Sequence, residues 1–243
     1  MNTIKFDKAD NPVKMVGHQG LYGLETGNTC AGFVAAGNRS YWGIECDIHV
    51  TADGQFAVIH DDNTMGVSGE DFEVEKTDLA TLRSITLFDR DGWQKTREDL
   101  KIPTLREYIR ICRKYEKYAV CEIKNPMTPK NIARAVNEVQ DEGWLEKTVF
   151  ISFSHHNMVE LRRLLPSAKL MYLTTESPTE ALLEKLLPWH LDLDIAWTVL
   201  TREGVELMHK HGLEVNVWNV DDKELATRLC EWGVDYITSN ILE

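Results

Sequence analysis

The sequence lacks the features of a secreted or membrane-spanning protein. It has no apolar run that approaches the roughly 18 residues of a membrane span, and residues 1–16, MNTIKFDKADNPVKMV, have no apolar stretch long enough for a signal peptide. Its five cysteines are odd in number and form no C-x-x-C pair, which predicts neither a disulfide framework nor a zinc site. We therefore expect a cytoplasmic protein without a membrane span.

Basic residues are also in short supply. The chain has 27 Lys and Arg against 39 Asp and Glu, a net charge of −12. Nucleic acids and anionic membranes require a basic face, so we expect neither as the main partner. An anionic small substrate stays possible, because a bound divalent ion can reverse the field of an acidic site.

Short apolar runs alternate with amphipathic helical stretches along most of the chain. Such alternation predicts a parallel sheet, and eight units in 243 residues favour a closed TIM (β/α)₈ barrel, an α/β fold of roughly 250 residues. The sequence contains neither a G-x-G-x-x-G motif nor a Walker loop, so these motifs do not indicate a nucleotide-binding sheet instead. The expected barrel strands are residues 14–17, 43–50, 119–123, 148–153, 169–173, 193–197, 214–219 and 236–238.

One segment interrupts this rhythm. A strand at 55–59 is expected to pair back toward the site, and residues 61–101 then hold Gly and acidic clusters with one short helical piece near 79–85. We predict one domain over residues 1–243, with 61–101 as a small insertion after the second strand. Asn28 is the expected cap of the first helix, residues 29–36.

Polar residues gather at the carboxyl ends of the expected strands, where barrel active sites form. Glu45 and Asp47 are two residues apart on a strand and so point to one face. Adjacent carboxylates repel each other and are costly to desolvate unless a cation lies between them. Glu122 adds a third carboxylate, and such all-oxygen ligands suit Mg²⁺ or Ca²⁺. Glu45 with Asp47, or Glu122 with Lys124, would each by itself also fit a solvent-facing strand. It is their occurrence together, at matching ends of successive strands, that predicts an active site.

Several motifs in order resemble one family. The runs VGHQG, NTCAGFVAAG, GIECDIHVTADGQFAVIHDD and CEIKNP are similar to the HRG, PENT-x-x-AF, E-x-D-x-x-x-T-x-D-G, V-x-HD and E-x-K of glycerophosphodiester phosphodiesterases. The later runs GLEVNVWNVDD and GVDYITS also fit, so the resemblance covers about Met15 to Ser239. It implies a TIM barrel with a small insertion.

The resemblance also implies roles for individual residues. We expect His18 as the general base and His60 as the general acid, although sequence leaves their order open. It equally leaves open whether water or a substrate hydroxyl is the nucleophile. The implied metal ligands are Glu45, Asp47 and Glu122, and the implied substrate-binding residues are Gln19, Lys124 and Trp218.

The chain departs from the family pattern around the phosphate. Gln19 stands where the family has arginine, and Gly27 stands where the PENT motif has glutamate. Glu25, two residues upstream, is a candidate substitute. We hypothesise that the arginine and the glutamate form one polar network that is lost as a unit, because a buried charge without its partner is costly. We therefore expect activity with altered substrate preference.

The resemblance implies metal-dependent hydrolysis of small glycerophosphodiesters, such as glycerophosphocholine, to glycerol phosphate and an alcohol, within lipid metabolism. A lysophospholipase-D-like or sphingomyelinase-D-like activity is an alternative, although no basic amphipathic docking helix is evident. A catalytically weakened barrel that only binds a phosphorylated ligand is another, because of Gln19. The headgroup, the metal and the oligomeric state stay open.

Overall fold

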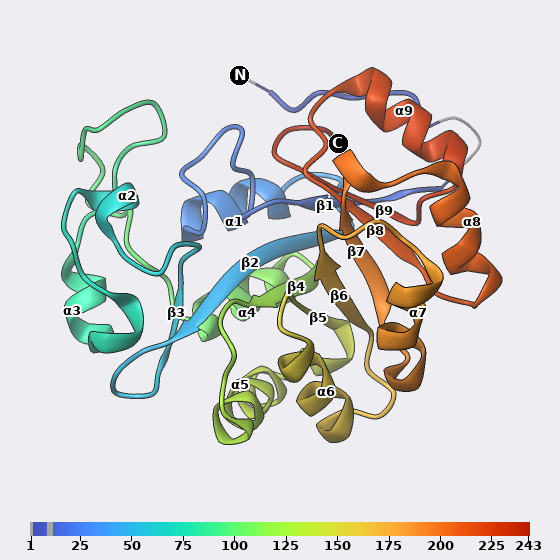
Figure 1. Cartoon of the computed structure of the whole chain (residues 1–243). Coiled ribbons are helices and arrows are strands. Elements are labelled where there is room, and N and C mark those ends of the chain that lie inside the picture. The colour runs from blue at the N-terminus through green and yellow to red at the C-terminus, as the bar shows by residue number, and fades with distance from the viewer. Residues whose placement is uncertain (1, 9–11) are drawn as a thin grey trace.

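A closed parallel barrel forms the centre of the computed structural model, which describes residues 2–8 and 12–243. In those residues eight parallel strands follow the order β1-β9-β8-β7-β6-β5-β4-β2, and pairing of β1 with β2 closes the ring (Figure 1). The predicted (β/α)₈ barrel is therefore confirmed. Its strands are β1 (Lys14–Gly17), β2 (Gly43–Val50), β4 (Tyr118–Ile123), β5 (Thr148–Ser152), β6 (Leu170–Thr174), β7 (Asp192–Ala196), β8 (Val215–Trp218) and β9 (Tyr236–Ser239).

Helices surround the barrel, and most begin at a side-chain cap (Figure 1). None of those in residues 2–8 and 12–243 is long and apolar enough to cross a membrane. The helices between barrel strands are α1 (Cys30–Gly37), α4 (Leu105–Lys114), α5 (Pro129–Asp141), α6 (His155–Leu164), α7 (Glu180–Leu186), α8 (Arg202–Lys210) and α9 (Lys223–Trp232), with 3₁₀ turns η2 (Leu145–Lys147), η3 (Leu187–Trp189) and η4 (Trp197–Val199).

The cap of the first helix differs from the prediction. Thr29, not Asn28, is the N-cap of α1, and its Oγ1 accepts a hydrogen bond from the backbone N–H of Gly32. Asn28 has a left-handed φ of 52° and is buried. Its side chain turns to Asp47 in the barrel mouth. The sequence pattern could not separate two adjacent cap formers, because both residue types favour that position.

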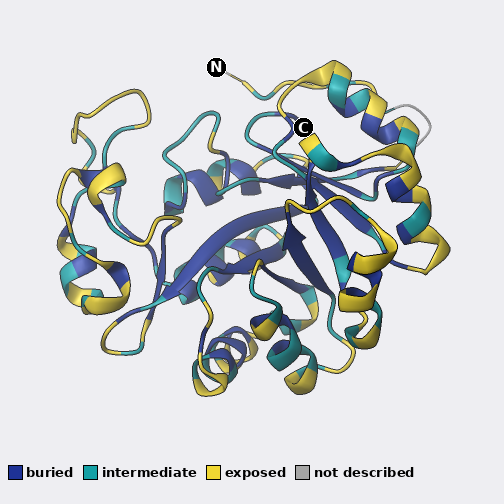
Figure 2. Ribbon diagram, in the orientation of Figure 1, coloured by how far each residue is buried: buried dark blue, intermediate teal, exposed yellow. Residues whose placement is uncertain are grey.

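The core has two layers, one on each side of the barrel strands, which are coloured mostly as buried in Figure 2. A large apolar cluster fills the space between barrel and helices. A smaller cluster closes the barrel interior, so the barrel is packed rather than open as a pore. The interior cluster contains Val16, Val120, Val149, Ile151, Met171, Leu173 and Tyr236.

The insertion, residues 61–101, follows β3 (Phe56–Val58), which pairs antiparallel with β2. It continues through α2 (Met65–Ser68), the 3₁₀ turn η1 (Val74–Lys76) and α3 (Leu79–Ser84), at the left of Figure 1. These elements enclose a small apolar core of their own beside the barrel mouth. That core contains Ala57, Ile59, Val74, Leu82, Ile85, Leu87, Leu100 and Ile102.

Glu107 joins the insertion to the barrel. It accepts hydrogen bonds from both Nη atoms of Arg83 on α3, and it completes the capping box of α4 with Thr104. Burial alone would raise the pKa of Glu107, but the bonds from Arg83 and Thr104 outweigh it and lower that pKa. The negative charge of Glu107 therefore stabilises the folded state.

Glu107→Gln should lower the free energy of unfolding at pH 7 by about 1–2 kcal/mol, the size of a helix cap with a half-exposed ion pair. Because the folded-state pKa is depressed, this stabilisation is present above the unfolded value of about 4.3 and is lost as pH falls through the folded value. Urea denaturation at pH 7 and pH 4 should show that the difference in the free energy of unfolding between wild type and variant is smaller at pH 4. An equal gap at both values would contradict the electrostatic origin.

Candidate active site

Three carboxylates meet at the barrel mouth. Glu45 and Asp47 lie on β2, and the register of β2 with β4 places Glu122 beside Asp47. One carboxylate oxygen from each residue lies within 4.8 Å of the other two. All three side chains are buried, with at most 7% of the residue exposed. The structure thus brings together the three carboxylates that the sequence singled out.

The carboxylates repel one another. Burial, with the charges of Asp47 and Glu122, raises the pKa of Glu45 well above its ordinary value. Burial and the charge of Asp47 likewise raise the pKa of Glu122 to about 8. For Asp47, burial would raise the pKa, but Lys124, His60 and a hydrogen bond from Asn28 lower it overall.

Lys124 supplies only part of the balancing charge. Its Nζ lies 2.9 Å from Oε1 of Glu122 and 3.3 Å from Oδ1 of Asp47. Oε1 of Glu122 is buried, and among residues 2–8 and 12–243 its polar contact is this ion pair with Lys124, without a well-directed hydrogen bond. A buried carboxylate oxygen with a free lone pair suits a bound cation. The donor set therefore fits a divalent metal.

His18 follows β1 at the edge of this cluster. Its Nδ1 lies 2.7 Å from Oδ1 of Asn240. The amide of Asn240 is oriented by Asp221, which accepts a hydrogen bond from Asn240 Nδ2 at 2.6 Å. Oδ1 of Asn240 therefore faces the ring and accepts the Nδ1 proton, which leaves Nε2 of His18 with a lone pair. Burial lowers the pKa of His18 and so favours the neutral imidazole.

His60 follows β3 and lies half-exposed at the mouth, with its Nδ1 2.8 Å from Oδ1 of Asp61. Its backbone carbonyl lies 3.3 Å from Nε2 of His49, which is fully buried on β2. His49 also approaches Oε1 of Glu75 from η1 at 3.3 Å. His60 has the carboxylate of Asp61 as its partner, whereas His18 has the amide of Asn240. The two histidines therefore have different electrostatic surroundings.

Gln19 contacts the carboxylate cluster through its backbone. It has a left-handed φ of 48°, and its N–H donates to Oε2 of Glu45 at 2.7 Å. Its side-chain Oε1 fills the space beside Gly27, where any Cβ would lie 2.4 Å from that oxygen. A side chain at position 27 would therefore require the end of the Gln19 side chain and the ring of Tyr22 to move. Glu25 is ion-paired with Arg97 of the insertion at 2.8 Å.

Sequence reasoning missed two groups of the site. Asn28 donates from Nδ2 to Oδ2 of Asp47 at 2.7 Å, and Asn240 orients His18. Asn240 directly follows the last strand, so the rule that used strand ends elsewhere could have found it. Asn28 lies in a loop before α1, and its capping propensity concealed its role.

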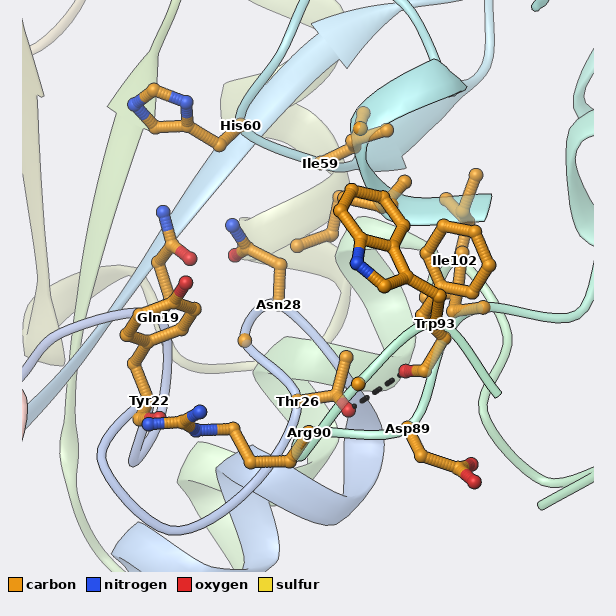
Figure 3. A pocket seen from close by; sticks show the side chains of 17 residues that line it. Gln19, Tyr22, Thr26, Asn28, Ile59, His60, Asp89, Arg90, Trp93 and Ile102 are labelled. Carbon is orange, nitrogen blue, oxygen red and sulfur yellow. Dashed lines mark hydrogen bonds between the residues drawn. The ribbon is translucent and has the colours of Figure 1, made fainter. Parts of the chain in front are cut away.

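Two cavities adjoin the histidines, and His60 lines both. The inner cavity, of about 220 Å³, lies over the barrel interior and includes His18, Glu122, Lys124, Asp194 and Trp218 in its wall. The outer cavity, of about 290 Å³, lies between the β1–α1 loop and the insertion. Figure 3 shows Gln19, Tyr22, Arg90 and Trp93 around this outer cavity.

A family model for glycerophosphoryl diester phosphodiesterases matches residues 18–242. The chain belongs to this family. It is 27% identical over 239 residues to a glycerophosphodiester phosphodiesterase of Caldanaerobacter subterraneus subsp. tengcongensis, with 93% of each chain covered. A Bacillus subtilis glycerophosphodiester phosphodiesterase is 26% identical, with 93% of this chain and 82% of the relative covered.

Solved structures share the fold of this family member. A glycerophosphodiester phosphodiesterase from Parabacteroides distasonis superposes with a TM-score of 0.79 at 26% identity, covering 95% of this chain and 93% of that one. An Oleispira antarctica phosphodiesterase, solved with the product sn-glycerol-3-phosphate, superposes with a TM-score of 0.86 at 24% identity, covering 96% and 94%.

Proposed function

We propose that this chain hydrolyses glycerophosphodiesters to glycerol phosphate and an alcohol with a divalent metal and a pair of histidines. The three buried carboxylates within 4.8 Å of one another, beside two histidines, carry the proposal. Family membership and the names of the curated relatives support the substrate class. The organisation as one domain with an insertion and the cytoplasmic location stay predictions from the sequence.

Glu45, Asp47 and Glu122 would hold the metal. Two oxygens on one ion lie at most twice the metal–oxygen distance apart, about 4.2 Å for Mg²⁺ and about 4.6–5.2 Å for Ca²⁺. Separations of at most 4.8 Å are close to these limits, so a small contraction around either ion would let the three carboxylates bind it. When bound, the metal would offset the charge that develops on the phosphoryl oxygens. Lys124, which is ion-paired with two of these ligands, would contact the phosphate.

The surroundings of the histidines favour His18 as the base and His60 as the acid. Asn240 fixes the His18 proton on Nδ1, so Nε2 is available to accept a proton from the nucleophile. Asp61 pairs with Nδ1 of His60, and the other ring nitrogen of His60 would protonate the leaving alkoxide. Trp218 lies in the wall of the inner cavity beside them, where we expect substrate contact.

The proposal is tested by assaying purified protein on glycerophosphocholine and glycerophosphoethanolamine with Mg²⁺, Ca²⁺ or a chelator. We expect release of glycerol phosphate that requires one of the two ions and is abolished by the chelator. Activity that survives the chelator would refute the metal-dependent mechanism. Absence of turnover on every glycerophosphodiester with either ion would refute the substrate class.

A further inference from the structure

A row of polar side chains crosses the barrel interior away from the three carboxylates of the proposed metal site. Asp194 on β7, Asn216 on β8 and Thr238 on β9 are each at most 4% exposed. Nδ2 of Asn216 donates to Oδ1 of Asp194 at 2.8 Å and to Oγ1 of Thr238 at 2.9 Å. Such a row is unusual beside the apolar interior cluster, because buried polar groups are costly without partners.

The row leaves one carboxylate oxygen unsatisfied. Both Nδ2 protons of Asn216 are used, and its Oδ1 accepts from Oγ1 of Thr238. Oδ2 of Asp194 is buried and has no hydrogen-bond partner in the described part of the chain. Because Asn216 has no further proton to give, a donor for this oxygen has to come from elsewhere.

The inner cavity is where that donor can enter. Asp194 and Thr238 belong to its wall, together with the metal ligands Glu45 and Glu122. In the ring of eight strands β7 lies four steps from β2 in either direction, so Asp194 faces the metal cluster across the barrel mouth. Nε1 of Trp218, in the same wall, is a second buried polar atom without a partner among residues 2–8 and 12–243.

The free acceptor and the free donor point to a hydroxyl-bearing group. A hydroxyl can donate to one atom and accept from another. With the proposed metal on Glu45 and Glu122 and with Lys124 in the same wall, the cavity would already hold the cations that balance these carboxylates, so we expect a neutral hydroxyl rather than a further ammonium group. Burial raises the pKa of Asp194 to about 7, so this carboxyl also carries less negative charge than an ordinary aspartate.

We propose that the inner cavity holds the glycerol unit of the substrate, and that a free glycerol hydroxyl donates a hydrogen bond to Oδ2 of Asp194. The inference rests on the proposed function and deepens it by assigning one substituent of the diester to one cavity. Asp194 is then a specificity residue that selects hydroxyl-bearing diesters, and the second substituent extends into the outer cavity on the other side of His60.

The test compares two substrates that differ only in the hydroxyls. These are the p-nitrophenyl ester of glycerol 3-phosphate and p-nitrophenyl propyl phosphate. Wild type should prefer the glycerol compound in kcat/KM by about 10- to 100-fold, because a site built for a hydroxyl rejects an analogue that lacks it. Asp194→Leu should reduce the preference to about threefold or less, with most of the change in the glycerol compound.

Asp192→Asn is the matched control. Asp192 lies two residues earlier on β7, pairs with Lys169 at 3.2 Å and is absent from the cavity wall. Its substitution should leave the preference unchanged even if it lowers stability. Equal losses on both substrates in Asp194→Leu would indicate a structural role and overturn the inference, as would an unchanged preference.

Binding separates this inference from the proposed activity. Calorimetry with sn-glycerol 3-phosphate and with propyl phosphate needs no turnover, and wild type should bind the first about tenfold more tightly or better. That result would uphold the inference even if neither ester were hydrolysed. Equal binding of the two phosphates by wild type would overturn it. This measurement needs only the wild type, so it decides the question even if Asp194→Leu does not fold.

Discussion

Glu45→Gln is expected to lower kcat/KM on glycerophosphocholine on the order of 10³-fold and to abolish stabilisation by Mg²⁺ or Ca²⁺. The carboxylate is one of three proposed ligands, and loss of metal-derived charge stabilisation of several kcal/mol corresponds to this factor. Glutamine keeps the size of the side chain and can still accept the hydrogen bond from Gln19 N–H. The loss would therefore report the charge rather than a packing defect.

The same variant should melt at an equal or higher temperature than wild type when both are metal-free. Three buried carboxylates repel one another, and burial disfavours the charge of Glu45 most clearly. Thermal unfolding with chelator and with added ion measures both effects.

Glu142→Gln is the control, because Glu142 is buried but ion-paired with Arg106 and Arg110 on the outer face. It should lose stability and keep activity. Metal-induced stabilisation that persists in Glu45→Gln would exclude Glu45 as a ligand.

Much of the fold and the carboxylate cluster could be predicted because they follow from simple periodicities. The alternation of side chains along a strand places Glu45 and Asp47 on one face. The rule that parallel strands end at one edge then brings Glu122 beside them, as the register of β2 and β4 shows. Both inferences need only local pattern and strand order.

The rest of the site depends on contacts between distant segments. Asn240 reaches His18 across 222 residues, and Asn28 reaches Asp47 from a loop with a left-handed backbone. Asp194 resembled an ordinary strand residue until its register with Asn216 placed both inside the barrel. Propensity and periodicity carry no information on such partners, which tertiary packing selects.

The two histidines should respond differently to the leaving group. His18→Ala is expected to lower kcat on the order of 10²- to 10⁴-fold. The variant lacks the neutral imidazole whose free Nε2 would accept the proton of the nucleophile. This loss should be similar for glycerophosphocholine and for the p-nitrophenyl ester of glycerol 3-phosphate. In wild type at saturating metal, the acidic limb of the kcat/KM profile should lie below about pH 6.5, because burial lowers the pKa of His18 and the base is lost on protonation.

His60→Ala should lose activity selectively. On glycerophosphocholine the leaving alkoxide needs a proton, so the loss should again be on the order of 10²-fold or more. On the p-nitrophenyl ester the phenolate departs without one, and the loss should be about tenfold or less. Exposed His211 provides a control that should change neither rate. If the selective loss appeared in His18→Ala instead, the acid and base roles would be exchanged; equal losses in both variants would mean that neither histidine serves only the leaving group.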